Sequence, residues 1–474
     1  MAVSNHEGTV LEDFESPRFR IARVTRTFVF VSLLVLIAFT AIPYGTAEVW
    51  WKAFFICAVF TLAIFWAIEG YLSHAWITDG WSIILPVAAL VLFSFLQTLS
   101  LGTLHLPSIA SPASRTISVD PYETRFFALQ LAAVGLYGLF LFRYLTTARR
   151  LRIVINLLIA IAVVSAIFGI LRRTAQHNTG FGLPLLHLEQ GYGQFINQNH
   201  FAYLMEMGLG LILGMVLGGG ISREQVLAYL AALLPIWTAL ALCGSRGGLI
   251  AMLAEIVVAA FLLSGILQNR QVGDSPSRLL GLLRSAPVRI GLFLILVCGV
   301  VFGTFYLGGE HLASRIEATR SDFSPGASDL REGVSRNEIW ALTYKIIAAH
   351  PVLGVGMGAY WAAVPEFHDA AGTFTPQEAH GDYLELLASG GLVGFAIGIW
   401  FLIAVVKKTK FTLQSPNRFR RAACLGAAIA IAGVAVHSLV DFGLHMIVNA
   451  LVFTTLIVIA TSEQPWNKEP IRES

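Results

Sequence analysis

SRNEIWALTYKIIAAHPVLGVGMGAYW spans Ser335–Trp361, and after a polar spacer AHGDYLELLASGGLVG spans Ala379–Gly394. Arginine, asparagine, glutamate and histidine collect in this segment, whereas most of the chain around it is apolar. Of the 474 residues, 56% are hydrophobic and 13% are charged, while a soluble domain carries about 25% charged residues. The composition predicts a polytopic membrane protein, and we expect this polar segment to hold its active centre.

Charge and cysteine usage argue against other classes. A formal net charge of +3 is too small to indicate a nucleic-acid partner, and no basic run is interleaved with stacking aromatics. The four cysteines all lie in apolar runs, so they predict neither a disulfide framework nor a zinc cluster. A polar tail precedes the first apolar run and no small-residue cleavage site follows that run, which argues against a cleavable signal.

Apolar runs long enough to cross a bilayer recur along the chain. They cover residues 27–43, 51–69, 82–100, 126–142, 153–171, 201–218, 226–244, 247–266, 290–307, 387–406, 422–440 and 444–461. The pattern predicts an all-α protein of about twelve transmembrane helices. We expect a tail at 1–26, nine helices within 27–307, a long loop at 308–386, three helices within 387–461 and a tail at 462–474.

Basic residues predict the orientation of these helices. They gather in the N-terminal tail and after the fourth, eighth and tenth runs, which all fall on one side if every run spans once. That side is expected to be the cytoplasm and to hold both termini, so the loop 308–386 faces outward. The sequence SLVDFGLHM, at 438–446, leaves little room for a turn between the last two helices. No internal repeat indicates the inverted halves common in transporters.

The long loop contains a well-delimited helix. Ser335 and Glu338 form a capping box, and Pro351 ends the helix. One side of the helix is apolar, so it is expected to lie along the membrane surface with Ile339, Trp340, Ile346 and Ile347. Arg336 stands in the first turn, where a cation opposes the helix dipole. It is either a solvated arginine, a partner of Glu338, or the binder of another anion.

A glycine turn and a histidine follow. GVGMGAY, at 354–360, has no preceding strand and no following Lys-Ser/Thr, so it predicts flexible packing rather than a nucleotide loop. His380 precedes a helical run, where the dipole favours a neutral imidazole that suits a proton acceptor. A bound diphosphate would oppose this effect, and capping or packing also explains a lone histidine. Gly390 and Gly391 predict a helix break or a close backbone contact.

Two signals lie upstream. In CGSRGGLIAM, Arg246 stands between two apolar runs among glycines that let a ligand approach closely, although arginines at such places also reach toward lipid phosphates. In QFINQNHFAYLMEMG, Asn197, Asn199 and His200 lie at the outer mouth of a helix. Helix capping explains one amide, and binding of sugar hydroxyls explains the others.

Ionisable residues also lie deep in the apolar runs or beside them. Glu206 and Glu255 fall within spans, where such groups face a cavity or a partner. His437, Asp441 and His445 have spacings that place them on one helix face, in a cluster that is either structural or functional. No further acidic cluster accompanies them in the sequence, so no metal site is predicted.

Five of these motifs occur together in one known family. NQNHFAYLMEMG, the SRGG turn, RNEIW with HPVLGVGMGAY, AHGDYLELLASGGLVGF and HSLVDFGLHMIVNAL follow the order of the O-antigen ligase family, which the chain resembles over Asn197–Ala460. That superfamily includes Wzy-type polysaccharide polymerases and protein O-oligosaccharyltransferases. The resemblance implies a GT-C-like, metal-independent glycosyltransferase of the bacterial inner membrane, acting on lipopolysaccharide or exopolysaccharide. Its donor is a glycan on undecaprenyl diphosphate at the periplasmic face, and no cofactor is needed because the donor is activated.

The resemblance assigns roles to named residues. Its catalytic residues map onto Arg246, Arg336 and His380. Two guanidinium groups can clamp the diphosphate as it gains negative charge, and a neutral imidazole can take the proton of the acceptor hydroxyl. Candidate substrate-binding residues are Asn197, Asn199, His200, Asp382 and Glu385. The chain departs from many members at two positions, Gly381 and Ser389, where asparagine and an acidic residue are common.

Several acceptors and one other class remain open. The acceptor is the lipid A core, a growing saccharide or a protein hydroxyl, and the lack of an added soluble domain favours the first two. A secondary transporter or polysaccharide flippase is the alternative from another class, and a non-catalytic scaffold is a third. Expected partners are the lipid-linked donor, the acceptor, membrane lipid and other polysaccharide-export proteins, with no nucleic acid.

Overall fold

The computed structural model describes residues 17–42, 44–76, 79–100, 116–175, 191–268, 336–368 and 376–463. These ranges form helices joined by turns, without a strand. The α-helices are α2 (Pro17–Thr40), α3 (Val49–Ser73), α4 (Trp81–Gln97), α5 (Pro121–Tyr144), α6 (Ala148–Thr174), α7 (Gln198–Leu217), α8 (Arg223–Cys243), α9 (Arg246–Gln268), α12 (Arg336–Ala349), α13 (Tyr360–Phe367), α14 (Asp382–Thr412), α15 (Arg418–His437) and α16 (Ile447–Thr461). Two short 3₁₀ helices are η1 (Tyr44–Thr46) and η4 (Gly443–His445).

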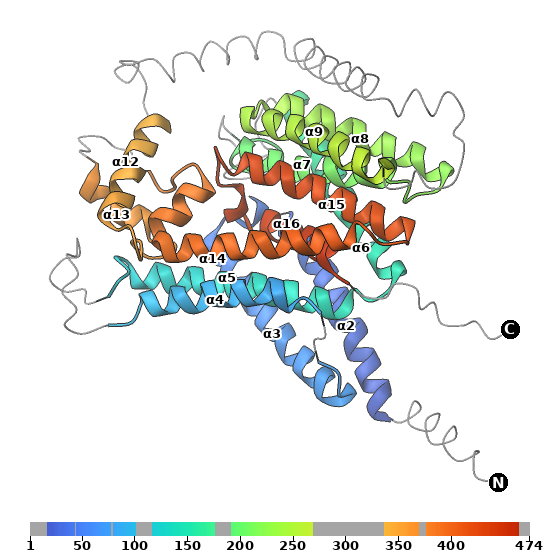
Figure 1. Ribbon diagram of the computed structural model, residues 1–474, viewed down its shortest axis with the longest axis horizontal. Helices are drawn as coiled ribbons and strands as arrows, with labels where there is room; N and C mark the ends of the chain where they lie inside the picture. The colour runs from blue at the N-terminus through green and yellow to red at the C-terminus, as the bar shows by residue number, and fades with distance from the viewer. Residues whose placement is uncertain are drawn as a thin grey trace.

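The helices match the predicted spans. Among the described residues, nine helices are long and apolar enough to cross a membrane. The shorter apolar helices α4 and α16 correspond to two further runs. The run at 290–307 lies outside the described residues. The prediction of an all-α, multi-pass membrane protein is confirmed (Figure 1).

Several helices extend past their apolar runs. α2 begins at Pro17 instead of Thr27, so the arginines expected in a tail belong to its first turns. Their side chains reach polar partners on α3: Arg18 donates to the backbone oxygen of Leu72, and Arg26 pairs with Glu69. α14 runs from Asp382 to Thr412, beyond the predicted 387–406. Hydropathy missed these ends because polar residues that find partners continue a helix as well as apolar ones do.

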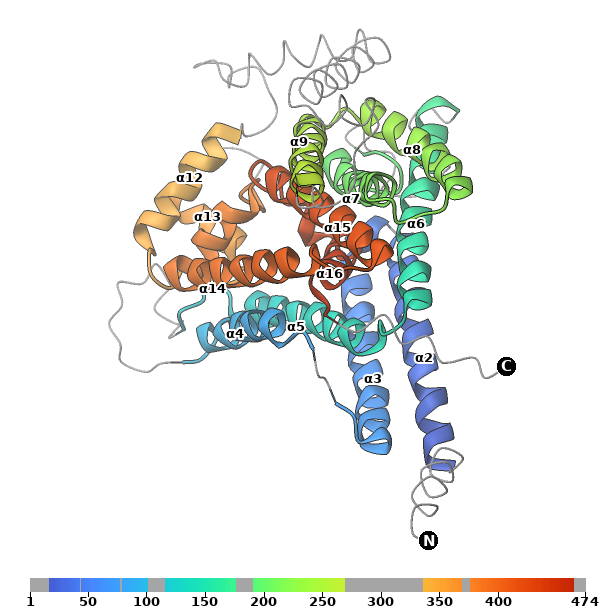
Figure 2. The ribbon, with the colours of Figure 1, turned by 45° about the vertical axis from the view of Figure 1, so that its right-hand side comes forward.

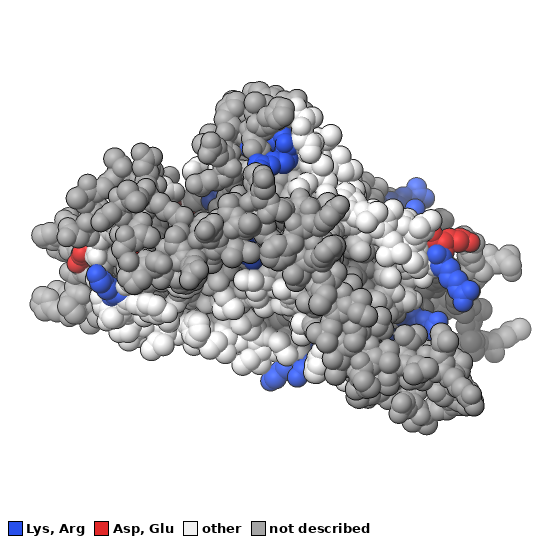
Figure 3. Space-filling model, turned by 90° about the horizontal axis from the view of Figure 1, so that it is seen from above, with Lys and Arg blue, Asp and Glu red and all other residues white. Residues whose placement is uncertain are grey.

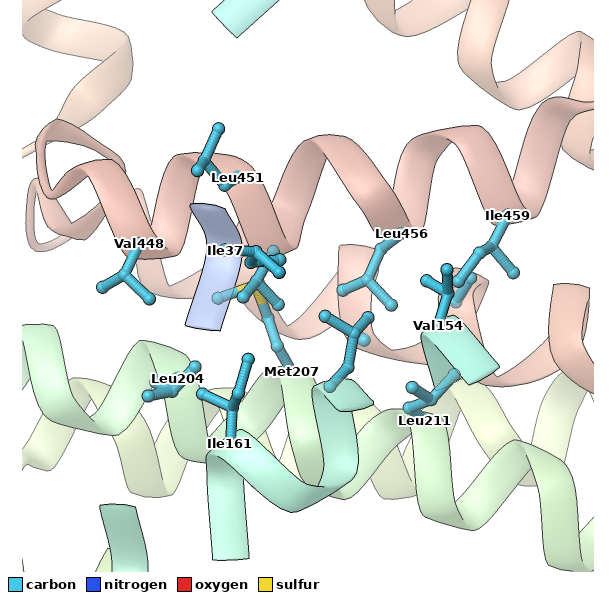
Figure 4. Close-up of a cluster of buried hydrophobic side chains, with 14 of the residues drawn as sticks. Ile37, Val154, Ile161, Leu204, Met207, Leu211, Val448, Leu451, Leu456 and Ile459 are labelled. Atoms are coloured by element: carbon cyan, nitrogen blue, oxygen red, sulfur yellow. The ribbon is translucent and has the colours of Figure 1, made fainter. Parts of the chain in front are cut away.

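The centre of the bundle is α7, which packs against α6, α8, α9 and α15 (Figures 1 and 2). Small residues let α7 approach α15 closely. Gly210 lies against Ala430, and Gly214 lies against Gly426. Glycines spaced four residues apart place backbones in direct contact, which is how helices associate where lipid supplies no hydrophobic drive. Beside this contact, apolar side chains of α2, α6, α7 and α16 form one core (Figure 4).

One end of the bundle collects basic residues. Glu69 of α3 is fully buried and pairs with Arg26 of α2 and Arg143 of α5 at 2.8 and 3.0 Å. Lys408 of α14 pairs with Glu463, whose backbone N–H donates to Asp79 at 2.7 Å. The basic residues before the first span and after the fourth and tenth spans therefore share one end, as predicted, and those after the eighth span lie outside the described residues. Much of the described surface between charged groups is uncharged (Figure 3).

A glycine turn joins α12 and α13 to the bundle. Gly354, Gly356 and Gly358 have positive φ. Between them, Val355 accepts from the N–H of Val119 at 2.9 Å and donates to Ala388 at 3.0 Å. The turn is therefore a closely bonded joint to α14 and the segment before α5, and the flexible packing expected for it is wrong.

α14 breaks where the paired glycines predict. Gly391 has φ 58° and ψ −162°, which interrupts the helix. The N–H groups of Leu392 and Val393 bond instead to Pro351 and Val352, at 2.9 and 3.2 Å. Both predicted outcomes, a break and a close backbone contact, occur at this site. The interruption seats the end of α12 against α14.

Candidate active site

Arg336 is the first residue of α12. Ser335, the other member of the predicted capping box with Glu338, lies outside the described residues. The apolar side of α12 packs on protein: Leu342 and Ile346 are buried with Val364 of α13 and Ala388 of α14. The expectation that this side lies on the membrane surface is wrong. The same pattern of apolar residues fits lipid or protein, and only the tertiary fold decides between them.

Arg336 binds a carboxylate far along the chain. Its Nη2 lies 3.0 Å from Oδ2 of Asp441, and Nδ2 of Asn199 donates to the same oxygen at 2.6 Å. Asp441 is only 1% exposed, whereas the Arg336 side chain is 35% exposed. The hydroxyl of Tyr203 donates to the backbone oxygen of Asp441 at 3.3 Å. Asp441 thus joins α7, α12 and the turn after α15.

That turn separates three residues expected on one helix face. α15 ends at His437, and residues 438–446 form turns and η4 before α16 begins. His437 faces Glu206 within the bundle, Asp441 faces Arg336, and His445 faces carboxylates at the start of α14. The one-face prediction is wrong because the chain leaves the helix directly after His437.

His380 packs on the same turn. Its ring meets Phe442 edge to face with centroids 4.9 Å apart, and Phe442 also contacts His200 at 4.8 Å. His380 directly precedes the N-cap of α14, as predicted, and has φ 49°. Trp340 of α12 donates to its backbone oxygen at 3.4 Å. α12 therefore supplies both Arg336 and a contact that fixes the backbone of His380.

The environment of His380 favours a neutral imidazole. Burial lowers its pKa and the positive charge of Arg336 lowers it further, while Asp441 opposes both effects. Its Nδ1 atom is buried and has no hydrogen-bond partner among the residues that the structure describes. At neutral pH the side chain is therefore a base rather than a cation.

The predicted substrate-binding residues make contacts within the protein. Oδ1 of Asn197 accepts from the N–H of Asn199 at 2.8 Å and caps α7, so one amide is a helix cap as expected. Nε2 of His200 lies 3.8 Å from Asp441. Asp382 and Glu385 stand in the first turn of α14 and face His445. The structure brings Asn199 and His200 to Asp441, and Asp382 and Glu385 to His445.

Sequence reasoning missed the surroundings of His445. Its Nδ1 lies 3.2 Å from Glu378, and its Nε2 lies 3.6 Å from Glu385 and 3.7 Å from Asp382. We refer to these four residues as the His445 cluster. The expectation that no further acidic cluster accompanies His437, Asp441 and His445 is wrong, because these carboxylates come from a segment distant in sequence. Glu378, Glu385 and His445 each offer one donor atom within 4.8 Å of the others and could hold a metal ion; that no metal binds stays a prediction.

Arg246 begins α9 at the same end of the bundle. It is half-buried. Gly247 next to it lies against Nε2 of His437, and Gly248 lies against Ala202 of α7. These glycines seat the start of α9 on the last turn of α15, beside the turn that carries Asp441. A side chain at either glycine would collide with its neighbour, which gives a packing reason for the SRGG motif.

The ionisable groups within the spans also have neighbours. Oε1 of Glu206 lies 2.7 Å from Nδ1 of His437, whose ring stacks on Tyr203 at 4.1 Å. Glu255 lies against Gly433 of α15. Glu206 therefore has a partner, as expected for an ionisable group within a span.

Part of the chain matches a known protein family. Residues 230–399 match the model of the family described as O-antigen ligase. Over these residues the chain is similar to the O-antigen ligase family. The matched segment contains Arg246, Arg336 and His380, whereas Asn199 and Asp441 lie outside it. No curated protein matches the chain.

This similarity supports a broad activity. The chain is a multi-pass membrane enzyme of the O-antigen ligase or polymerase type, and its substrates are polysaccharides or lipid-linked glycans in general. The O-antigen ligase match covers α9, α12, α13 and part of α14, the elements that bring Arg246, Arg336 and His380 to one end of the bundle.

Proposed function

We propose that the chain is a metal-independent glycosyltransferase that moves a glycan from undecaprenyl diphosphate to an acceptor hydroxyl at the periplasmic face of the inner membrane. The product is a ligated O-antigen or a lengthened surface polysaccharide. The observation that carries the proposal is that Arg336 and His380 both contact the turn that bears Asp441 and Phe442: Arg336 pairs with Asp441, and the ring of His380 meets Phe442. A cation and a neutral base next to one another suit a reaction that releases an anion and a proton.

The arginines would stabilise the leaving group. The bond between the anomeric carbon and the diphosphate oxygen breaks, and the diphosphate departs with the electron pair. Asp441 is bonded to Nη2 of Arg336, and a guanidinium has five N–H donors. The remaining donors of this partly exposed side chain can bind the diphosphate in pairs. Arg246, at the start of α9, would supply the second guanidinium.

His380 would act as the base. The acceptor oxygen bonds to the anomeric carbon as its proton passes to the imidazole. The lowered pKa of His380 keeps the ring ready to accept that proton at neutral pH. Asp441 orients Arg336 and would stabilise the imidazolium once it forms, because it acts electrostatically on both side chains.

The two ends of the bundle support the proposed orientation in the membrane. Basic residues of α2, α5 and α14 gather at one end, which the positive-inside rule assigns to the cytoplasm. His380 precedes α14 and Arg336 binds the turn after α15, so both lie at the opposite end of these helices, where the periplasmic leaflet would present the donor. We therefore place both termini in the cytoplasm.

Glycan transfer by purified protein tests the proposal. Wild type and the variants Arg246→Ala, Arg336→Ala and His380→Ala are incubated with an undecaprenyl-diphosphate glycan and candidate acceptors. We expect transfer by wild type, also with chelator present, and loss in each variant. Lys345→Ala, which changes an exposed residue of α12, is the matched control and should retain full activity. Full turnover by all three site variants would overturn the assignment.

The products distinguish the alternatives. Transfer to lipid A core indicates a ligase, longer lipid-linked chains indicate a polymerase, and transfer to a serine or threonine peptide indicates protein glycosylation. Movement of the donor across vesicles without transfer would instead support a flippase. Fluorescence-detected size exclusion of each variant confirms that lost activity does not reflect lost folding.

A further inference from the structure

His445 stands between carboxylates from both sides of His380. Glu378 precedes His380 by two residues and lies 3.2 Å from Nδ1 of His445. Asp382 follows His380 by two residues and lies 3.7 Å from Nε2, with Glu385 at 3.6 Å. The imidazole of His445, on the turn before α16, therefore contacts both the segment that precedes His380 and the helix that follows it.

The charges of the cluster favour a permanent imidazolium. Burial alone would lower the pKa of His445, but Glu378, Glu385 and Asp382 outweigh it and raise the pKa to about 10. Burial alone would raise the pKa of Glu378, but His445, a hydrogen bond with Glu385 and the charge of Lys52 lower it to about 2. Because both groups stay charged through neutral pH, the ion pair between them is a lasting tie rather than a pH switch.

The backbone of His380 needs such a tie. A residue other than glycine at φ 49° has a strained backbone, and this conformation persists only where surrounding contacts hold it in place. Three contacts surround it: Ala379 N–H donates to Glu385 at 3.0 Å, Trp340 donates to the His380 oxygen at 3.4 Å, and Asp382 N–H donates to Ser438 at 3.0 Å. Glu385 makes the first of these while it faces His445, so the cluster and the strained backbone share a residue.

We propose that His445 is a positioning residue whose imidazolium ties Glu378 to the start of α14 and thereby aims His380 at the acceptor hydroxyl. The proposal rests on the function proposed above for His380. It assigns the cationic imidazole, rather than a metal ion, as the partner of the three carboxylates.

Kinetics of single and double variants test this role. His445→Gln removes the charge and should lower kcat at least tenfold, with KM for the donor changed by less than twofold. His445→Lys keeps a cation and should recover part of the loss. The double variant His445→Gln/His380→Ala should be no slower than His380→Ala alone, because His445 acts through His380. His350→Gln, on the far end of α12, is the histidine control and should keep wild-type kcat.

Hydrogen exchange supplies a second readout that does not need turnover. Amides at 376–386 should exchange faster in His445→Gln and in Glu378→Gln than in wild type. Wild-type kcat in His445→Gln, or additive losses in the double variant, would overturn the positioning role. Stoichiometric binding of Mn²⁺ or Zn²⁺ by wild type that disappears in Glu378→Gln would also overturn it in favour of a metal site. An inactive wild type would instead refute the proposed function.

Discussion

Arg336 and Asp441 form an ion pair of 3.0 Å between residues 105 positions apart. The carboxylate is buried, and the guanidinium reaches it from the partly exposed start of α12. A buried carboxylate needs a partner, while an arginine in the first turn of a helix needs an anion to offset the dipole. The pair meets both needs and fixes α12 to the turn between α15 and α16.

Replacing Asp441 by asparagine should weaken transfer. Asp441→Asn keeps the shape but removes the charge that orients Arg336, and hydrogen bonds to charged groups contribute about 1.5–3 kcal/mol. We expect kcat/KM to fall roughly 10–100-fold, which corresponds to about 1.4–2.7 kcal/mol. Asn199→Ala removes a neutral donor from the same carboxylate and should cost less. Unchanged kcat/KM in Asp441→Asn would show that the ion pair does not serve the reaction.

The pH dependence of transfer should report His380. Its pKa lies below the ordinary value of about 6.5, so the base is active at neutral pH and transfer falls as pH drops through the lowered pKa. Arg336 lowers this pKa and Asp441 raises it. As pH is lowered, the residual activity of Arg336→Ala should therefore fall at a higher pH than that of wild type. The activity of Asp441→Asn should fall at a lower pH than that of wild type. Rate profiles between about pH 4.5 and 8 check both directions, and shifts of the same sign would contradict the assignment.

The sequence predicts the spans well because hydropathy is a local property. It predicts helix ends less well, since α2 and α14 continue through polar residues whose partners lie on other helices. It also leaves open whether the apolar side of α12 meets lipid or protein, and the structure places protein there.

The site residues also divide into those that a local sequence signal predicts and those that it does not. Arg336 and His380 carry local signals, a cation in a first helical turn and a histidine before a helix. Their partners do not: Asp441 meets Arg336 only because the chain leaves α15 at His437, and Glu378 meets His445 across a distance that no sequence spacing encodes. The paired glycines were the exception, because Gly391 signals its own backbone conformation.

Gly391 should not tolerate a side chain. Its φ of 58° with ψ −162° is a region that only glycine adopts readily, and a Cβ there would lie 2.4 Å from the carbonyl carbon of Val352. Gly391→Ala should therefore destabilise the protein by about 2 kcal/mol or more and separate α12 from α14. Gly394→Ala is the control, because its Cβ would meet nothing closer than 3.7 Å. Equal thermal midpoints of the two variants in detergent would contradict the prediction.

The buried pair of Glu206 and His437 should serve stability within the membrane. The two side chains are fully buried and 2.7 Å apart, so removing one leaves the other polar and unmatched. Glu206→Ala should cost about 1–3 kcal/mol of stability, whereas Glu206→Gln keeps an oxygen for the His437 ring and should cost less. Thermal unfolding of both variants, with His437→Ala and the double variant, measures the coupling between the two residues. His437 ends α15, directly before the turn that bears Asp441, so the effect on transfer must also be measured. A loss of stability without a loss of transfer would separate the pair from the transfer chemistry. Additive losses of stability in the double variant would show that the contact contributes nothing.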